Sequence, residues 1–214
     1  MKQWPAWAGV ALIGLVSMTG RLVATAAPFE VDSTHSRAVI QVGKSGLFSF
    51  AGHTHEVVAS KLTGTIAFDR DAPAQSSVRL EIDARTLTVT GKGDPPDDVP
   101  KVQEAMQSAK VLDVARFPRI RFESASVTVK SQTAAALDLI VAGRFTLRDV
   151  THTVTAPVHV ALEKGVLTAD GSFSIKQSDY GITPISVAGA VVVKDALAIS
   201  FTVLAREHAA ATAR

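Results

Sequence analysis

Hydrophobic and polar residues alternate with a period of two along most of the chain from Phe29 onward. The clearest run covers residues 137–147, where Leu137 and Phe145 share one phase and Asp138 and Arg144 share the other. Such alternation places the two sets of side chains on opposite faces of a β-strand. Val, Ile, Thr and Phe, which favour strands, are frequent in these runs. The pattern predicts eight or nine strands, each with one buried face. The further runs are residues 78–83, 154–162, 173–175 and 197–203.

Clusters of turn-forming residues separate these runs. Because such turns are short, they predict antiparallel neighbours rather than parallel strands with crossover helices. The predicted turns lie at residues 69–73, 91–96, 164–165, 170–171 and 194–195.

Residues 100–109 break the alternation. Val102, Met106 and Ala109 recur at helical spacing, after Asp98 as an N-cap acid and Pro100 in the first turn. These features predict one helix of about three turns, inserted between two strands.

A set of antiparallel strands with one apolar face each can form either a sandwich or a closed barrel. Closure also removes exposed sheet edges, which otherwise invite aggregation. At about eight strands the interior of a barrel is filled by side chains or holds one small ligand. We therefore predict an all-β fold, a single extended antiparallel barrel of eight or so strands with one inserted helix.

The composition narrows the class of protein. The chain has 214 residues, is 47% hydrophobic and has no cysteine, which excludes a disordered chain, a disulfide scaffold and thiolate chemistry. Beyond residue 26 the basic and acidic residues balance, so no nucleic-acid footprint is visible. That part also has no tryptophan and only Tyr180 as a tyrosine, too few for the aromatic girdles of an outer-membrane barrel.

The amino terminus predicts export. Lys2 precedes an apolar run over residues 7–16, and Ala24-Thr25-Ala26 follows as a signal-peptidase pattern. The alternative is a retained membrane anchor, but the run is shorter than the roughly 20 residues that a bilayer requires. We predict a signal peptide at residues 1–26, cleavage after Ala26 and a periplasmic or secreted protein. The barrel domain is then 27–207, with an Ala-rich disordered tail at 208–214.

The apolar phases of the strands predict which side chains face the inside of the barrel. They would contact an apolar ligand, or they would simply fill a closed core. The predicted lumen residues are Phe48, Phe50, Ile66, Phe68, Leu80, Ile82, Ile120, Phe122, Leu139, Val141, Phe145, Val158, Val160, Phe173, Ile175, Ile199 and Phe201.

Histidines are the candidates for a metal site. His53 and His55 lie two apart, so on a strand they face the same way and could share a metal or a polar headgroup. A third metal ligand, such as His35 or Asp32, would have to be brought there by folding. The alternative is that they are surface or turn histidines near the barrel mouth. The run from His55 to Ala59 lacks the second histidine of the zinc-protease motif.

No catalytic motif is present. The serines lie outside any Gly-x-Ser-x-Gly elbow, and no phosphate-binding glycine loop occurs. We predict no enzymatic activity, no cofactor and no committed metal. Two alternatives stay open: a metal-assisted hydrolase or metal-binding barrel using His53 and His55, and a structural or interaction barrel with a filled core.

Six segments in order give the chain a resemblance to the YceI-like family of exported lipid-binding proteins, over about residues 29–206. The segments are VDSTHS (31–36), LTGTIAFD (62–69), SSVRLEIDA (76–84), LDVARFPRIRFES (112–124), GRFTLRDVT (143–151) and SDYGI (178–182).

The resemblance implies a lipocalin-like barrel whose lumen takes a long isoprenoid or other lipid tail, and it implies no catalytic residues. We therefore predict an exported, non-enzymatic carrier, store or sensor of a long-chain apolar lipid. A homodimer is left open. The helix and the loop at 91–98 are expected to cover one end of the barrel and to control access.

Overall fold

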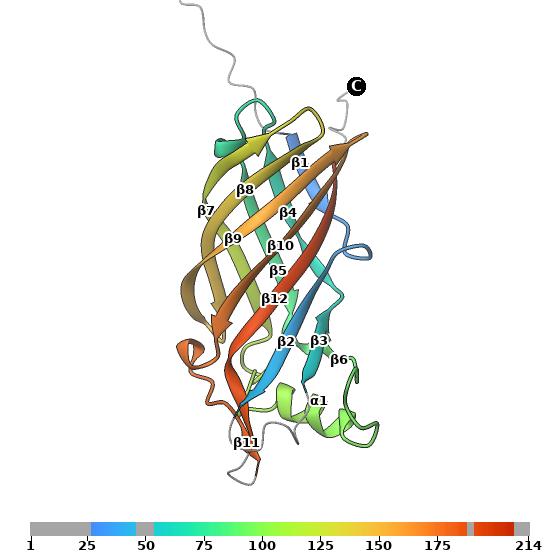
Figure 1. Cartoon of the computed structure of the whole chain (residues 1–214), viewed down its shortest axis with the longest axis vertical. Coiled ribbons are helices and arrows are strands. Elements are labelled where there is room, and N and C mark those ends of the chain that lie inside the picture. Colours follow the sequence, from blue (N-terminus) through green and yellow to red (C-terminus); the bar gives the residue numbers. More distant parts are fainter. Residues whose placement is uncertain (1–26, 46–53, 188–190, 208–214) are drawn as a thin grey trace, which may run out of the picture.

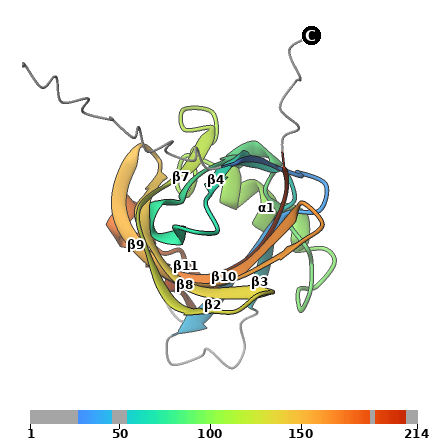
Figure 2. The same ribbon diagram turned by 90° about the horizontal axis from the view of Figure 1, so that it is seen from above.

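The computed structural model describes residues 27–45, 54–187 and 191–207 (Figure 1). Its antiparallel strands form one sheet that closes on itself, because β1 pairs with β4 on one side and with β12 on the other. The closed ring runs β1, β4, β5, β7, β8, β9, β10, β12 and is seen from above in Figure 2. The prediction of an eight-stranded antiparallel barrel with one helix is confirmed.

The described strands are β1 (Ala27–Val31), β2 (Arg37–Ser45), β3 (His55–Ala59), β4 (Leu62–Phe68), β5 (Ser77–Asp83), β6 (Thr88–Val89), β7 (Arg119–Gln132), β8 (Ala136–Leu147), β9 (Val150–Glu163), β10 (Val166–Lys176), β11 (Ser186–Val187) and β12 (Val191–Glu207). The helix is α1 (Val99–Gln107), and three short 3-10 turns are η2 (Pro73–Gln75), η3 (Ala84–Thr86) and η4 (Ser178–Tyr180).

Three strand positions of the ring are interrupted. β1 and β2 both pair with β12, with residues 32–36 between them, so they share one strand position. β4 pairs with β1 and β3 pairs with β2, so β3 and β4 share the next position. β5 and β6 form the third interrupted position. The alternation in the sequence predicts eight or nine strands. The sheet has twelve because these interruptions divide single strand positions and because β11 adds a short pairing with β12.

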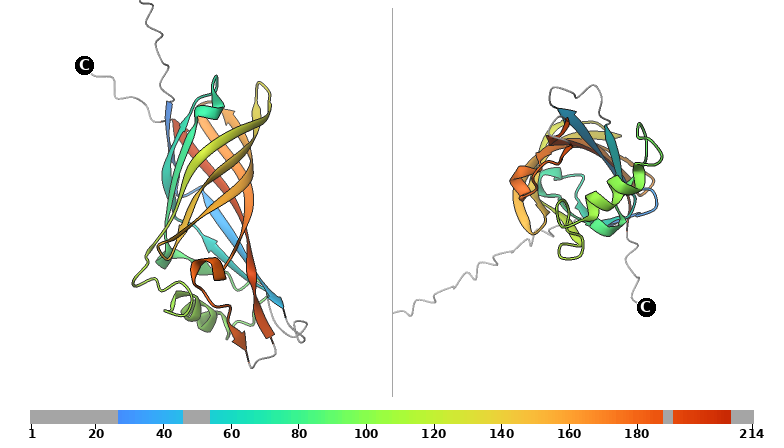
Figure 3. Two further views of the ribbon diagram at one scale, coloured as in Figure 1. Left: turned by 90° about the vertical axis from the view of Figure 1, so that its left-hand side faces the viewer. Right: turned by 90° about the horizontal axis from the view of Figure 1, so that it is seen from below.

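The interruptions divide the barrel into two parts. Above them lies the closed cylinder, whose lower rim is marked by the pairing of Asp83 with Arg119 at the start of β7. Below them β2, β3, β6, β11 and the first part of β12 continue, and α1 lies at this lower end (Figure 3). The Gln103 side chain of α1 accepts a hydrogen bond from the Val89 N–H at 2.8 Å and donates one to the Leu87 carbonyl at 2.9 Å. The helix thus covers the edge of the sheet that β7 leaves unpaired.

Two hydrophobic clusters lie inside the barrel, one above the other. The upper cluster contains Phe29, Leu137 and Leu167. The lower cluster contains Leu87 and Tyr180, and α1 packs Val99, Val102 and Met106 against it. Amphipathic spacing of α1 thereby produces the predicted cover over one barrel end.

The predicted helix at 100–109 is observed as α1, displaced slightly towards the amino terminus. Asp98 occupies the N-cap position, but its carboxylate accepts a hydrogen bond from Lys101 Nζ at 2.9 Å and caps no helix N–H. The helix ends early because Ser108 turns away in an extended conformation, and the chain then turns again at Asp113, whose φ is 49°.

Two of the predicted turns are wrong. Asp170 and Gly171 lie inside β10, because Gly171 pairs with Phe201 and leaves room for its ring. Residues 194–195 lie inside β12, where the register shifts between Val193 and Leu197 and marks an irregularity of the bulge type.

The predicted turn at 164–165 is confirmed. Lys164 and Gly165 have φ values of 50° and 76°, as a two-residue hairpin of type I′ requires. Arg148 and Asp149 form a similar left-handed turn, with φ of 52° and 58°, that is not among the predicted turns. This turn was missed because neither residue is glycine or asparagine, the residues that usually mark a left-handed turn in a sequence.

No helix in the described part of the chain is long and apolar enough to cross a membrane.

Candidate functional site

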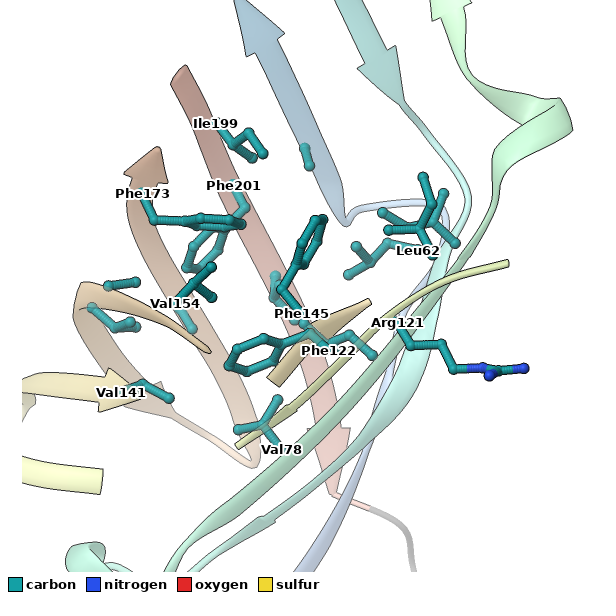
Figure 4. Close-up of a pocket in the computed structure, with 18 of the residues that line it drawn as sticks. Leu62, Val78, Arg121, Phe122, Val141, Phe145, Val154, Phe173, Ile199 and Phe201 are labelled. Atoms are coloured by element: carbon teal, nitrogen blue, oxygen red, sulfur yellow. The ribbon is translucent and has the colours of Figure 1, made fainter. Parts of the chain in front are cut away.

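An apolar cavity of about 120 Å³ lies inside the closed cylinder, between the two hydrophobic clusters (Figure 4). Its wall comes from all around the ring, because alternate residues of each strand face inward. Arg121 contributes to the wall, but its side chain points away from the cavity. The lining residues are Ala38, Leu62, Ile66, Val78, Leu80, Ile82, Ile120, Arg121, Phe122, Val141, Phe145, Val154, Ala156, Val158, Ala169, Phe173, Ile199, Phe201 and Val203.

Most of the predicted lumen residues line this cavity: Ile66, Leu80, Ile82, Ile120, Phe122, Val141, Phe145, Val158, Phe173, Ile199 and Phe201. Phe68, Leu139, Val160 and Ile175 are buried in the hydrophobic clusters but do not line it. Phe48 and Phe50 lie outside the described residues. The structure therefore places the described lumen residues inside the barrel, while their contact with a ligand stays a prediction.

Several wall residues were absent from the predicted set. Val78, Val154 and Ala156 continue alternations already visible in the sequence, so the signal was available for them. Ala38 and Ala169 are small and gave no strong apolar signal. Their small side chains contribute to the space in the cavity because they fill little of the barrel interior.

Phenylalanine rings define the cavity. The rings of Phe145 and Phe173 meet edge to face at 5.5 Å between centroids, and Phe173 and Phe201 lie 6.4 Å apart. Phe122 and Phe201 each lie against a glycine of a neighbouring strand. A Cβ atom at Gly143 would be 2.6 Å from Phe122 Cζ, and one at Gly171 would be 2.5 Å from Phe201 Cζ. The two glycines let these rings lie close to the wall instead of filling the axis.

Tyr180 packs below this ring cluster. Its ring lies 5.9 Å from that of Phe145, and burial raises the pKa of its phenol. The phenol therefore stays neutral at physiological pH.

An empty cavity of this kind is costly. The side chains of its wall have no packing partners on the cavity side, so they lose the dispersion contacts of a filled core. A purely apolar void also stays dry, because water finds no partners there. An apolar ligand would recover part of this free energy by filling the space.

The candidate metal residues do not come together among the described residues. No group of three or more histidine, aspartate or glutamate side chains is placed to hold a metal ion there. His53 lies outside the described residues. His35 is exposed in the turn after β1, where its Nδ1 lies 2.9 Å from Asp32 Oδ2. Asp32 forms an Asx turn, in which its Oδ1 accepts a hydrogen bond from the Thr34 N–H at 3.1 Å.

His55 lies at the lower end of the barrel, on β3. Its Nδ1 is 2.8 Å from Oδ1 of Asp94, whose side chain is 1% exposed. Glu56, the next residue, binds Gln41 and Lys92 instead, so consecutive side chains of β3 use different partners.

The sequence and the fold agree with one family. The model of the YceI-like domain matches residues 29–205, which is most of the chain. The chain belongs to the YceI-like family. No curated protein matches it by sequence.

Several solved structures resemble this member of the YceI-like family. BcnA of Burkholderia cenocepacia superposes with a TM-score of 0.62 at 21% identity, covering 81% of this chain and 98% of BcnA. A polyisoprenoid binding domain from Saccharophagus degradans, implicated in plant cell wall breakdown, superposes with a TM-score of 0.62 at 16% identity, covering 86% and 99% of the two chains. At these identities the likeness shows the shared barrel fold.

The cavity of this YceI-like protein is suited to binding. Its wall offers apolar carbon. Family membership supports a binding protein, and the chemistry of the wall selects an apolar ligand.

Proposed function

We propose that the chain is an exported, non-enzymatic protein that holds the apolar tail of a long-chain lipid, isoprenoid or fatty-acid-like, inside its barrel. The observation that carries this proposal is the apolar cavity between the two hydrophobic clusters. The polyisoprenoid binding domain of Saccharophagus degradans, which shares the fold, supports the same class of ligand.

The energetics favour such binding without a special residue. Burying about 500 Å² of tail would contribute roughly 12 kcal/mol at 25 cal/mol per Å². Association and ordering would offset several kcal/mol of this. The cavity is close in size to the roughly 150 Å³ void that accepts one benzene ring. A long tail therefore needs the ring cluster to move aside, and selectivity follows tail shape and length.

Export is the second part of the proposal. Lys2, the apolar run and Ala24-Thr25-Ala26 support removal of residues 1–26. The first strand begins at Ala27, so cleavage after Ala26 would leave β1 whole. The mass of the protein recovered from its native host is expected to begin at Ala27, and an intact mass that begins at Met1 would contradict cleavage.

Native mass spectrometry of the gently extracted protein tests the cargo. We expect a co-purifying lipid of defined mass. An empty protein that also fails to take up added polyprenol or fatty alcohol would refute lipid binding and leave the alternative of a structural barrel.

A matched pair of variants links this binding to the cavity. Ala169 lines the cavity, whereas Ala142 lies on β8 between the inward-facing positions Val141 and Gly143 and so faces outward. Ala169→Leu is expected to occupy the void and to lower lipid loading at least about tenfold, which corresponds to about 1.4 kcal/mol, with little loss of stability. Ala142→Leu should leave loading unchanged. Equal loading of the two variants would place the lipid elsewhere.

A further inference from the structure

A polar pair lies on the inner side of the lower end, apart from the cavity wall. His55 Nδ1 and Asp94 Oδ1 are 2.8 Å apart, and the Asp94 side chain is 1% exposed while His55 is 23% exposed. Asp94 belongs to the loop between β6 and α1, and His55 begins β3. The pair therefore joins the helix-bearing loop to the sheet.

Asp94 has one carboxylate oxygen that receives no hydrogen bond from any described part of the chain. Oδ2 is buried, and it is the one buried side-chain oxygen or nitrogen without a hydrogen-bond partner among the described residues. Leaving a buried carboxylate oxygen without a donor is unfavourable, so such atoms normally have a partner. This oxygen has the chemistry to accept a hydrogen bond from a ligand.

The loop is built to hold Asp94 in place. Gly91 and Gly93 have φ values of 74° and 85°, which favour glycine, and the Asp94 N–H donates to the Gly91 carbonyl at 3.1 Å. The Thr90 N–H donates to the Glu56 carbonyl at 2.9 Å, which extends the pairing of β6 with β3. The carboxylate is thus fixed in a folded turn.

An apolar inner wall connects the cavity to this pair. His55 pairs with Val42 on β2, Val57 pairs with Ile40, and Ala59 pairs with Ala38, which lines the cavity. Alternate residues share a face, so His55 has the same phase as Val57 and Ala59. The five residues from Ala38 to Val42 span roughly 13 Å, a distance that a long-chain lipid covers.

We propose that His55 and Asp94 form a headgroup site that receives an uncharged hydrogen-bond donor, the O–H or amide N–H of a lipid whose tail lies in the cavity. Asp94 Oδ2 accepts from this donor, and His55 is a positioning residue that holds Oδ1. The inference rests on the proposed lipid-binding function and adds the class of headgroup. A headgroup that is only an acceptor, such as an ether or a carboxylate, leaves the oxygen unserved.

Four probes with one tail test the proposal on the full barrel domain. Binding of oleyl alcohol, oleamide, oleyl methyl ether and oleate is measured at pH 7. We expect the alcohol, the amide or both to bind at least about tenfold tighter than the ether, since a hydrogen bond to a charged group has this magnitude. Oleate should bind no better than the ether. The ranking of alcohol and amide identifies which donor the site takes.

Two substitutions test whether the preference for a donor headgroup depends on Asp94. Asp94→Asn keeps the shape of the side chain and is expected to reduce the donor preference to about threefold or less, with the dissociation constant of the ether unchanged. Asp138→Asn is the matched control, because Asp138 also contacts a histidine, His159, at 2.7 Å but lies exposed on the outside. The control should keep the full preference.

The outcomes separate the two proposals. Equal binding of alcohol, amide and ether by the wild-type protein would overturn the headgroup site while the tail-binding function stands, and it needs no variant that might misfold. A preference that persists in folded Asp94→Asn would also overturn the site. Failure of all four probes would refute the lipid-binding function itself.

Discussion

At the scale of single residues, the cavity depends on two glycines. Gly143 and Gly171 face inward from β8 and β10, and the rings of Phe122 and Phe201 occupy the space that a side chain would take. Glycine inside a strand usually weakens it, but it also permits close approach of a neighbour. Here the neighbour is a phenyl ring, and the result is open space on the barrel axis.

Gly171→Ala is expected to destabilise the fold and to reduce binding in the cavity. The new Cβ would lie 2.5 Å from Phe201 Cζ and 2.7 Å from the Pro157 carbonyl oxygen. Overpacking of this kind typically costs about 1–3 kcal/mol. Denaturant unfolding and binding of an apolar fluorophore measure the two effects. The double variant Gly171→Ala with Phe201→Leu should recover binding; if it does not, the ring is not the cause.

Asp32 gives a prediction for pH. A hydrogen bond from Thr34, followed by those from His35 and Arg206, holds the pKa of Asp32 well below its ordinary value. The native carboxylate then stays charged at a pH where the unfolded chain binds a proton. Its contribution to stability is complete above the unfolded pKa of about 4 and is lost as pH falls through the lower native pKa.

The measurement is the Tm of wild type and Asp32→Asn as a function of pH. Wild type should melt higher at pH 7, and the gap should narrow below about pH 4. A gap that is the same at neutral and acid pH would show that the Asp32 charge contributes nothing to folding.

At the scale of elements, sequence periodicity predicted much of what is observed. Alternation identified the inner faces of β5, β8, β9, β10 and β12, and helical spacing identified α1. Both patterns are visible in the sequence because the side chains on one face of each element must be apolar to be buried. The interruption between β3 and β4 was invisible because Ser60 and Lys61 are not strong turn formers. The polar partner of His55 was also unpredictable, since Asp94 is distant in sequence and only folding brings the two together.

The attachment of α1 can be tested at Gln103. This side chain accepts a hydrogen bond from the Val89 N–H and donates one to the Leu87 carbonyl at the β6 edge. Gln103→Ala leaves both groups without that partner and is expected to cost about 1–3 kcal/mol of stability. Exchange of bound lipid should become faster if α1 controls access, as measured by stopped-flow transfer to vesicles.

Glu104→Ala is the control, because Glu104 is exposed on the same helix. Its stability and exchange rate should match wild type. Unchanged exchange in a folded Gln103→Ala protein would remove α1 from the access route.

At the scale of the whole molecule, the two parts of the barrel differ in how their backbone is held. In the closed cylinder each strand has two neighbours, whereas the lower end relies on short strands and on one helix. Regions with fewer paired neighbours open at lower free energy. The lower end is therefore expected to open without disturbing the cylinder.

Hydrogen exchange of the ligand-free protein measures this difference. Amides of β3, β6 and α1 should exchange faster than those of β8, β9 and β10. Bound lipid should slow exchange at the lower end if the tail and headgroup reach it. Uniform protection across both parts would mean that the barrel opens as one unit.

The pairing of β1 with β12 also fixes where the described chain ends emerge. Phe29 is opposite Glu207, so both ends leave from the same rim, and α1 lies at the other extremity of the barrel (Figure 1). A fluorescent fusion, a purification tag or a surface linker joined before Ala27 or after Glu207 would therefore start at the rim opposite the helix. Immobilised through that rim, the protein would present its helix-covered end to the surrounding solution.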